Sequence, residues 1–209
     1  RERENTFPLI IGGGPCAFNP EPLADFFDAF VIGDGEEVAV QISNQVIEFK
    51  KQGDGQKKTL LKLLSKIDGV YVPSFFEPKY DGNGIQTHSP VFEDYKIVKR
   101  AFLPALTKDN FPTSPILPFG KPIHDRLRLE IARGCSRGCR FCQAGMIYRP
   151  IRERSLEDLI EIAHTSLKTT GHSDISLLSL STGDYSNLPQ LMERLLDLSQ
   201  GYCNAISLP

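Results

Sequence analysis

The sequence predicts an α/β protein, and three observations lead to this prediction. Residues 127–209 alternate strand-like and helix-like segments in the order β-α-β-α-β. Residues 8–50 show short apolar strands that end in glycine turns and are followed by helical patterns. Residues 70–126 are interrupted by prolines throughout, which excludes long helices there. We therefore expect two α/β segments that are joined by a connector.

Composition and charge exclude several classes of protein. The chain has 209 residues, 40% of them hydrophobic, and a net charge of −2, so it is globular and shows no overall attraction to nucleic acid or anionic membrane. Six arginines form a local basic patch: Arg133, Arg137, Arg140, Arg149, Arg152 and Arg154. We interpret this patch as a solvated face that supports an anionic cofactor. A nucleic acid partner is the alternative. No apolar run is long enough for a membrane helix and no signal peptide precedes the first strand. The odd cysteine count favours a reducing compartment, so we expect a cytoplasmic protein without a membrane partner.

Residues 1–50 have the rhythm of a doubly wound sheet. A strand over 8–14 ends in a run of three glycines, a brief helix is possible at 23–27, and a second strand over 30–32 ends in another glycine turn. Apolar residues at helical spacing predict a helix over 36–50. This pattern is typical of the end of a Rossmann-like domain.

Residues 51–126 predict a helix followed by a proline-rich connector. Leucines and an isoleucine at helical spacing mark a helix over 60–67. The turn signal at 81–84 predicts that residues 69–76 and 85–98 pair as short strands around it. We interpret the remainder as an extended linker between domains.

Residues 127–209 predict the first half of a partial (β/α) barrel. A strand over 127–132 leads into a cysteine-rich loop, and a capping box at Ser155 opens a helix that ends at Gly171. A strand over 175–180, a helix after Asn187 and a third strand from 204 follow. Active sites of such barrels lie at the carboxyl ends of the strands. The cysteine loop and residues 181–184 are therefore expected at the same edge of the sheet, with Arg128 and Glu130 either beneath a ligand or paired with neighbours.

The cysteine loop is the strongest chemical signal in the chain. Cys135, Cys139 and Cys142 are spaced Cys-x3-Cys-x2-Cys. Three thiolates can hold three irons of a four-iron cluster and leave the fourth open to a ligand. The alternatives are a ferredoxin-like cluster and a structural zinc site, and the latter needs a fourth ligand from one of these residues: Cys16, Cys203, His124 or His164. We interpret Cys16 and Cys203 as small core residues instead.

With an aromatic residue at 141 and a strand before it, this loop resembles the radical S-adenosylmethionine (SAM) superfamily. The resemblance implies a [4Fe-4S] cluster on the three cysteines, with SAM bound to the open iron and cleaved to a 5′-deoxyadenosyl radical by one electron from the cluster. Phe141 would lie near the adenine, and four residues after the second strand would contact the methionine amino group: Ser181, Thr182, Gly183 and Asp184. Residues 179–185 also look like the corresponding strand end of methylthiotransferases. An electron donor such as a flavodoxin or ferredoxin is implied as a partner.

Residues 7–40 resemble the end of the cobalamin-binding domain that precedes many radical SAM barrels. In that case Gly12, Gly13 and Gly14 would let the nucleotide tail of cobalamin approach the backbone. The Asp-x-His-x-x-Gly motif of base-off cobalamin binders does not occur in this sequence. Cobalamin is therefore a possible cofactor only.

The resemblance implies a radical SAM enzyme that carries out a methylation, with or without cobalamin, or another C–H modification. The alternatives are an enzyme similar to tRNA methylthiotransferases and a non-enzymatic interaction domain stabilised by zinc or a cluster. Few residues follow Cys142, so we expect a chain truncated at both ends that is inactive by itself. The substrate is not predicted.

Overall fold

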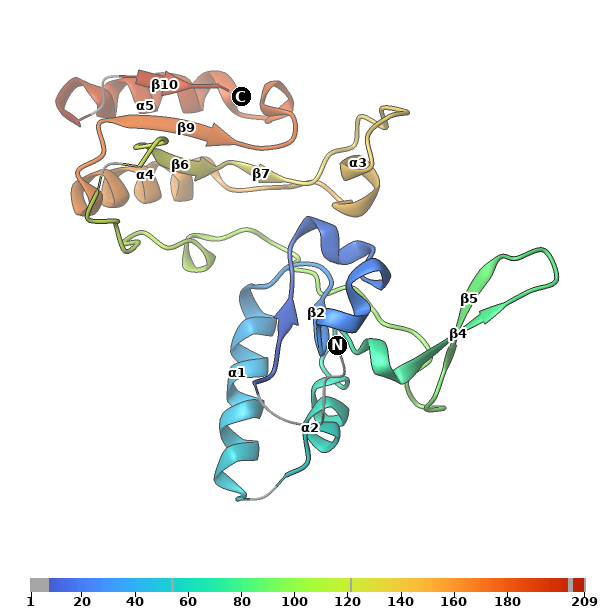
Figure 1. The fold of residues 1–209 in the computed structure, drawn as a ribbon. Helices are drawn as coiled ribbons and strands as arrows, with labels where there is room; N and C mark the ends of the chain where they lie inside the picture. Colours follow the sequence, from blue (N-terminus) through green and yellow to red (C-terminus); the bar gives the residue numbers. More distant parts are fainter. Residues whose placement is uncertain (1–7, 54, 121, 203–204, 209) are drawn as a thin grey trace. The chain divides into compact units, whose positions relative to one another are not determined.

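A computed structural model describes residues 8–53, 55–120, 122–202 and 205–208 (Figure 1). The chain forms two compact units, Arg1–Leu103 and Pro104–Pro209, which are described separately. The division falls inside the predicted connector. Among the described residues, no helix combines the length and the hydropathy that crossing a bilayer requires.

The first unit contains a small mixed sheet. Strands β1 (Ile11–Gly12) and β2 (Ala29–Val31) are parallel, whereas β3 (Val70–Tyr71) pairs with β2 in the antiparallel direction. The doubly wound pattern therefore holds for the first two strands only. Between them the chain forms two 3-10 helices, Pro15–Phe18 and Glu21–Phe26, and no α-helix, because the prolines of this segment interrupt α-helical hydrogen bonding.

Two helices pack with this sheet. Helix α1 (Glu36–Lys51) agrees with the prediction, and α2 (Lys57–Leu64) begins three residues before the predicted helix. Residues from both helices, β2, β3 and the segment after β3 share one core: Ala29, Val38, Ile42, Phe49, Leu60, Leu61, Leu64, Val70, Val72, Phe75, Tyr95 and Ala101. Residues 57–101 thus contribute to a packed core, which an extended linker would not do.

A β-hairpin extends from this unit. Strands β4 (Phe76–Tyr80) and β5 (Gln86–Pro90) are antiparallel, as the turn signal predicts. The carboxylate Oδ1 of Asp81 accepts hydrogen bonds from the backbone N–H groups of Asn83 and Ile85, both at 2.8 Å, and so closes the turn. Both predicted strands are wrong in their bounds. β3 and a 3-10 helix (Pro73–Phe75) occupy the residues before Phe76, and β5 ends at Pro90, eight residues before the predicted end.

The second unit is built on three parallel strands. Strands β6 (Leu127–Glu130), β9 (Asp174–Leu178) and β10 (Ala205–Ser207) lie side by side in sequence order. Helix α4 (Leu156–Thr170) connects the first two and α5 (Leu188–Tyr202) the last two, so the predicted β-α-β-α-β order is confirmed.

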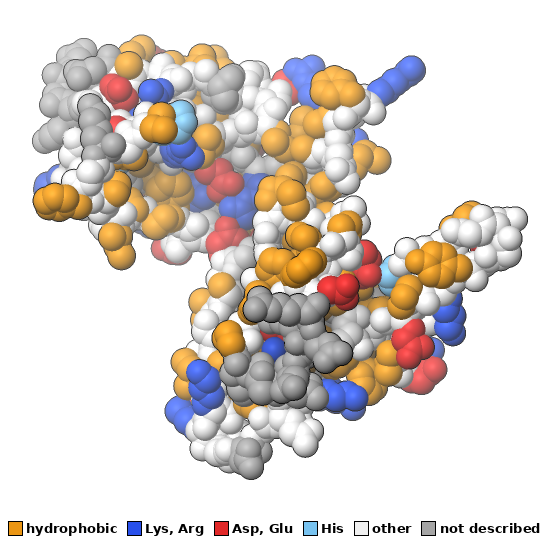
Figure 2. Space-filling model, in the orientation of Figure 1, with side chains coloured by type: hydrophobic (Ala, Val, Ile, Leu, Met, Phe, Trp, Pro, Cys, Tyr) orange, Lys and Arg blue, Asp and Glu red, His pale blue; other side chains and the backbone are white. Residues whose placement is uncertain are grey.

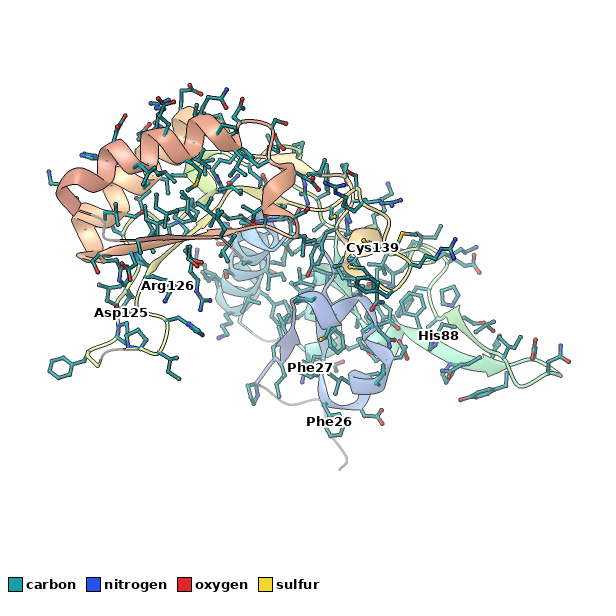
Figure 3. All side chains as sticks on the ribbon, turned by 90° about the horizontal axis from the view of Figure 1, so that it is seen from above. Phe26, Phe27, His88, Asp125, Arg126 and Cys139 are labelled. Atoms are coloured by element: carbon teal, nitrogen blue, oxygen red, sulfur yellow. The ribbon has the colours of Figure 1, made fainter. Side chains whose placement is uncertain are left out.

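Both helices cover the same face of this sheet (Figures 1 and 3). The alternating side chains of the strands that point to this face form the core with α4 and α5: Leu127, Leu129, Ile175, Leu177, Leu159, Ile162, Leu167, Leu191 and Leu195. The opposite face carries a polar row, in which Arg128 pairs in register with Ser176 and Ser176 with Ser207. At the predicted start of α4, the Ser155 hydroxyl accepts a hydrogen bond from the Asp158 N–H at 3.1 Å.

Candidate metal and cofactor site

The cysteine loop of the second unit begins and ends at two short strands that pair with each other. It leaves β7 (Ala132–Arg133), passes through α3 (Ala144–Ile147) and returns as β8 (Arg152–Glu153), which pairs with β7. At its base, Gly134 has φ +93°, and an added Cβ would lie 2.5 Å and 2.6 Å from the carbonyl oxygens of Tyr148 and Pro150. Only glycine fits this close approach, so Gly134 is required for closing the loop.

The three cysteines differ in exposure. Cys135 is buried, Cys142 is partly exposed and Cys139 is exposed. The backbone N–H of Arg137 donates to the Cys135 sulfur at 3.5 Å, and the N–H of Cys142 donates to the Cys139 carbonyl at 3.0 Å. These contacts shape the turn that carries the three cysteines.

The thiol groups themselves do not form a preassembled cage. Among the described residues, no three side chains of Cys, His, Asp or Glu gather closely enough to hold a metal ion. Metal binding itself can draw such ligands together, because its free energy is coupled to the folding of the segment that carries them. The donor set itself fits an iron–sulfur cluster, since three soft thiolates stand on one short loop.

An ion pair joins this loop to the end of the next strand. Arg137 donates from Nε to the Asp184 Oδ2 at 2.5 Å and from Nη2 to Oδ1. Asp184 closes a 3-10 helix (Thr182–Asp184) that follows β9. The two segments that the sequence places after successive strands therefore meet at the carboxyl edge of the sheet.

Asp184 is held in its ionised form. The guanidinium of Arg137 lowers the pKa of the Asp184 carboxyl to about 2, and a hydrogen bond from the Ser181 hydroxyl at 2.7 Å adds to this effect. Both partners favour the carboxylate over the protonated acid. A carboxylate that is paired with Arg137 thus lies beside the cysteine loop at every pH at which proteins are commonly studied.

The other residues predicted after β9 have distinct surroundings. Thr182 is buried, and its hydroxyl lies 2.8 Å from that of Ser179, so it contributes to the shape of the loop. A Cβ at Gly183 would meet nothing within 4 Å. The structure therefore brings Asp184 to the cysteine loop and Ser181 to Asp184, while Thr182 turns inward and Gly183 lies open.

Phe141 is the predicted site residue that packing explains least. Its side chain is 92% exposed, and Met146 on α3 is also exposed. Figure 2 shows hydrophobic and basic side chains together at the end of the second unit that carries α3, and Figure 3 places Cys139 there, opposite Asp125 and Arg126 at the start of β6. Phe141 therefore has no packing role, and its exposed ring is free to contact a ligand.

Sequence reasoning missed a buried arginine beside the site. The Arg154 side chain is fully buried and donates to the Glu130 carbonyl at 3.2 Å, to the Thr107 carbonyl and to the Asn110 Oδ1 at 3.2 Å. Burial lowers the pKa of its guanidinium. Arg152 is buried as well, so the interpretation of a solvated arginine face is wrong for these two residues.

Glu130 belongs to the same network. Its carboxylate accepts hydrogen bonds from Arg133 at 2.9 and 3.0 Å. The alternative that Glu130 pairs with its neighbours is therefore confirmed, whereas Arg128 is exposed. The sequence shows an arginine, Arg154, directly after the segment that forms β8 and an acidic residue, Glu130, at the end of the β6 segment. These two residues are 24 positions apart in the chain, so the sequence alone does not show that they are in contact.

The glycine run of the first unit has a packing explanation. A Cβ at Gly12 would lie 2.7 Å from the ring of Phe30 and 3.1 Å from that of Phe27, so core aromatic rings fill this space. Gly13 would meet only Val31, at 4.0 Å, and Gly14 has φ +91° with nothing near it. Phe30 thus occupies the space next to Gly12, so this glycine has a packing reason that does not depend on a cofactor.

In the described part of the chain, neither Cys16 nor a histidine belongs to a group that could hold a metal ion. Cys16 is exposed, so its interpretation as a core residue is wrong, and Cys203 lies outside the described residues. His124 and His164 are exposed. A hollow of about 500 Å³ in the first unit, lined by charged residues that include Asp34, contains none of the predicted site residues.

Comparison with known proteins supports a radical SAM-type protein. A family model described as "Radical SAM proteins, N-terminal" matches residues 1–73. "Uncharacterized protein MJ0966" from Methanocaldococcus jannaschii is 31% identical over 203 residues, which is 94% of this chain and 37% of that protein. "Ribosomal protein uS12 methylthiotransferase RimO" from Elusimicrobium minutum is 25% identical over 178 residues, which is 81% of this chain and 40% of that protein.

The chain thus spans about two fifths of the length of these curated relatives. No solved structure matches it significantly. The radical SAM superfamily is the class that the family model and the methylthiotransferase relative support.

Proposed function

We propose that this chain is the cluster-binding part of a radical SAM enzyme. Cys135, Cys139 and Cys142 would hold a [4Fe-4S] cluster, which together with SAM supplies one-electron cleavage of the sulfonium. The observation that carries the proposal is the Arg137–Asp184 ion pair, which sets the loop after β9 against the three-cysteine loop. Two loops that meet at the carboxyl edge of a parallel sheet are the usual components of an active site in this fold class.

The residues around the loop have separable tasks. Phe141 offers an exposed aromatic face for the adenine ring, since stacking on such a face excludes water from one side of the ligand. The Asp184 carboxylate offers a negative charge to the amino group of the methionine part. Ser181 orients that carboxylate through its 2.7 Å hydrogen bond. The chain's own contribution is thus binding and orientation, while the cofactor provides the reactive chemistry.

The sheet supports a barrel for the complete protein. Three parallel strands in sequence order, with both connecting helices on one face, match the beginning of a (β/α) barrel. The polar row of Arg128, Ser176 and Ser207 would then face the interior. A free-thiol cluster favours the cytoplasm.

Anaerobic reconstitution of the full-length protein with iron and sulfide tests the proposal. We expect a brown protein that consumes SAM and releases 5′-deoxyadenosine when a reductant is added. Replacing Cys142 with alanine should abolish cluster binding, whereas Cys16→Ala should retain it. A colourless protein that binds one zinc ion and leaves SAM intact would show a structural metal domain instead.

Methylthiotransferase activity is the second candidate, and its support is the similarity to a ribosomal protein methylthiotransferase. The two candidates differ in product. Mass spectrometry of tRNA and ribosomal protein from cells with and without the gene should show a missing methylthio group if this candidate is right. If the deletion strain retains every methylthio group, methylthiotransferase activity is excluded, and methylation or another C–H modification becomes the favoured reaction.

Cobalamin use is the least supported part of the proposal. The family model over residues 1–73 names radical SAM proteins only. A titration of the full-length protein with hydroxocobalamin, followed by gel filtration, decides the question. An unchanged spectrum and no retained cobalamin would remove this cofactor.

A further inference from the structure

We propose that Arg137 is a positioning residue for metal binding. Through its ion pair with Asp184, it fixes the turn between Cys135 and Cys139 against the end of β9. The proposal rests on the proposed function, because it takes the three cysteines as the metal ligands.

The position of Arg137 in the loop gives it influence over two ligands. It stands between Cys135 and Cys139, and its backbone N–H donates to the Cys135 sulfur at 3.5 Å. Its guanidinium also interacts electrostatically with both thiols. A displacement of Arg137 therefore changes the surroundings of two of the three sulfur atoms together.

The outer half of the loop needs such an anchor. Residues 136–141 are all exposed, so core packing contributes little to holding them. The ion pair connects this segment to a different βα unit, which lies 47 residues further along the chain. A loop that is fixed before the metal arrives loses less conformational entropy on binding.

The other end of the anchor is firmly placed. Asp184 accepts a hydrogen bond from the Ser181 hydroxyl, and its N–H donates to the Ser181 carbonyl at 3.1 Å. The next residue, Tyr185, is buried and donates its hydroxyl to the Arg154 carbonyl at 2.9 Å. Asp184 is thus tied to the core of the second unit within one residue.

Arg137 has two effects that must be separated. Its positive charge attracts the sulfur ligands of a bound metal whether or not it is anchored. Asp184→Asn keeps that charge and removes the ion pair, whereas Arg137→Gln removes both. Arg140→Gln is the matched control, because Arg140 is an exposed arginine of the same loop that carries the same charge.

The experiment is an anaerobic titration of the full-length, cluster-free protein with Co²⁺. The thiolate-to-cobalt charge-transfer absorbance is recorded at each addition and gives the dissociation constant for Co²⁺. We expect Asp184→Asn and Arg137→Gln to weaken Co²⁺ binding between about threefold and tenfold, in line with exposed bidentate pairs and outer-shell partners of metal ligands. The double variant should bind no more weakly than the weaker single variant, because both changes break one link. Asp184→Glu should restore most of the affinity, and Arg140→Gln should change it less than twofold.

Several outcomes would overturn the inference. Wild-type affinity in Asp184→Asn would show that the ion pair does not position the loop. Equal losses in Arg137→Gln and Arg140→Gln would show an effect of charge alone. Circular dichroism of each variant identifies any that fails to fold. If either Arg137→Gln or Asp184→Asn does not fold, the other one still tests the ion pair, because both remove it.

The proposed function is tested separately in the same protein. If Co²⁺ binds through the thiolates as described but the iron-loaded protein leaves SAM intact, the positioning role stands and the enzymatic proposal fails. If Cys142→Ala binds Co²⁺ as well as the wild type, the cysteines are not the ligands and both proposals fail.

Discussion

The Gly12–Gly14 run of the first unit and the cysteine loop of the second unit differ in how far packing explains their residues. At Gly12 the missing side chain makes room for the Phe30 ring, which is a complete structural reason. In the cysteine loop, packing explains Gly134 at the base but neither the exposed Phe141 nor the exposed Cys139. Residues without a packing reason are the better candidates for ligand contact, so the comparison favours the cysteine loop as the functional site.

The largest expected effect tests the base of the cysteine loop. Gly134→Ala should destabilise the second unit by about 3 kcal/mol, because a Cβ would collide with two backbone carbonyls at a φ that side chains rarely adopt. Thermal unfolding of the full-length protein measures this change. Gly183→Ala is the matched control, with open space around it, and should change stability by no more than about 0.5 kcal/mol. Similar values for both variants would show that Gly134 does not close the loop.

The next effect tests the packing explanation in the first unit. Gly12→Ala should cost about 1–3 kcal/mol, since the added Cβ would lie 2.7 Å from the Phe30 ring. Gly13→Ala should cost less, because its nearest neighbour is at 4.0 Å. Denaturant unfolding gives both values.

A second substitution sharpens the same test. Phe30→Leu should relieve part of the cost of Gly12→Ala, because the smaller side chain leaves room for the new methyl group. If Gly12→Ala leaves stability unchanged and weakens hydroxocobalamin binding instead, the packing explanation is wrong and the cofactor interpretation returns.

A smaller effect on stability, with a distinct effect on binding, is expected at Phe141. Its ring is almost fully exposed, so Phe141→Ala should change the free energy of unfolding by no more than about 0.5 kcal/mol. The same change should weaken S-adenosylhomocysteine binding to the reconstituted protein by roughly fivefold or more, through lost stacking. Calorimetry measures the affinity, and Phe119→Ala, another fully exposed phenylalanine, is the control. Equal affinities of the two variants would contradict a ligand contact at Phe141.

The smallest expected effect is the pH dependence of the Arg137–Asp184 ion pair. The pKa of Asp184 is lowered from 3.8 to about 2, so the ion pair with Arg137 stabilises the folded chain fully above pH 4 and is lost as pH falls toward 2. The NMR signal of the Arg137 Nε–H should therefore stay constant from pH 7 to 4 and move below that range. Movement centred near pH 4 would indicate an unpaired carboxyl.

Local signals predicted most of the second unit. The capping box at Ser155, the glycine at 171 and the alternation of Leu127 and Leu129 each fix an element by contacts between near neighbours. Parallel strands then follow from the βαβ rule, and the meeting of the two loops follows from the strand directions. The meeting of these two loops was thus predictable because short-range rules and chain topology agree.

Long-range packing limited the prediction elsewhere. The antiparallel direction of β3 depends on how residues 57–72 fold back onto β2, and no local pattern encodes this. Likewise, an arginine in a basic run normally faces water, and only the assembled fold shows that Arg154 is buried beside Glu130. The role of Gly12 needed the position of Phe30, 18 residues away.

The buried Arg154 side chain also has a consequence for limited proteolysis. It holds the Thr107 carbonyl, while Lys108 pairs with Glu161 on α4 at 2.8 Å. Ile116 and Phe119 are fully exposed further along the same segment and are suited to cleavage. A protease that cuts there would sever the chain before β6, yet the peptide that carries Thr107 should stay bound to the remaining fragment until a denaturant releases it.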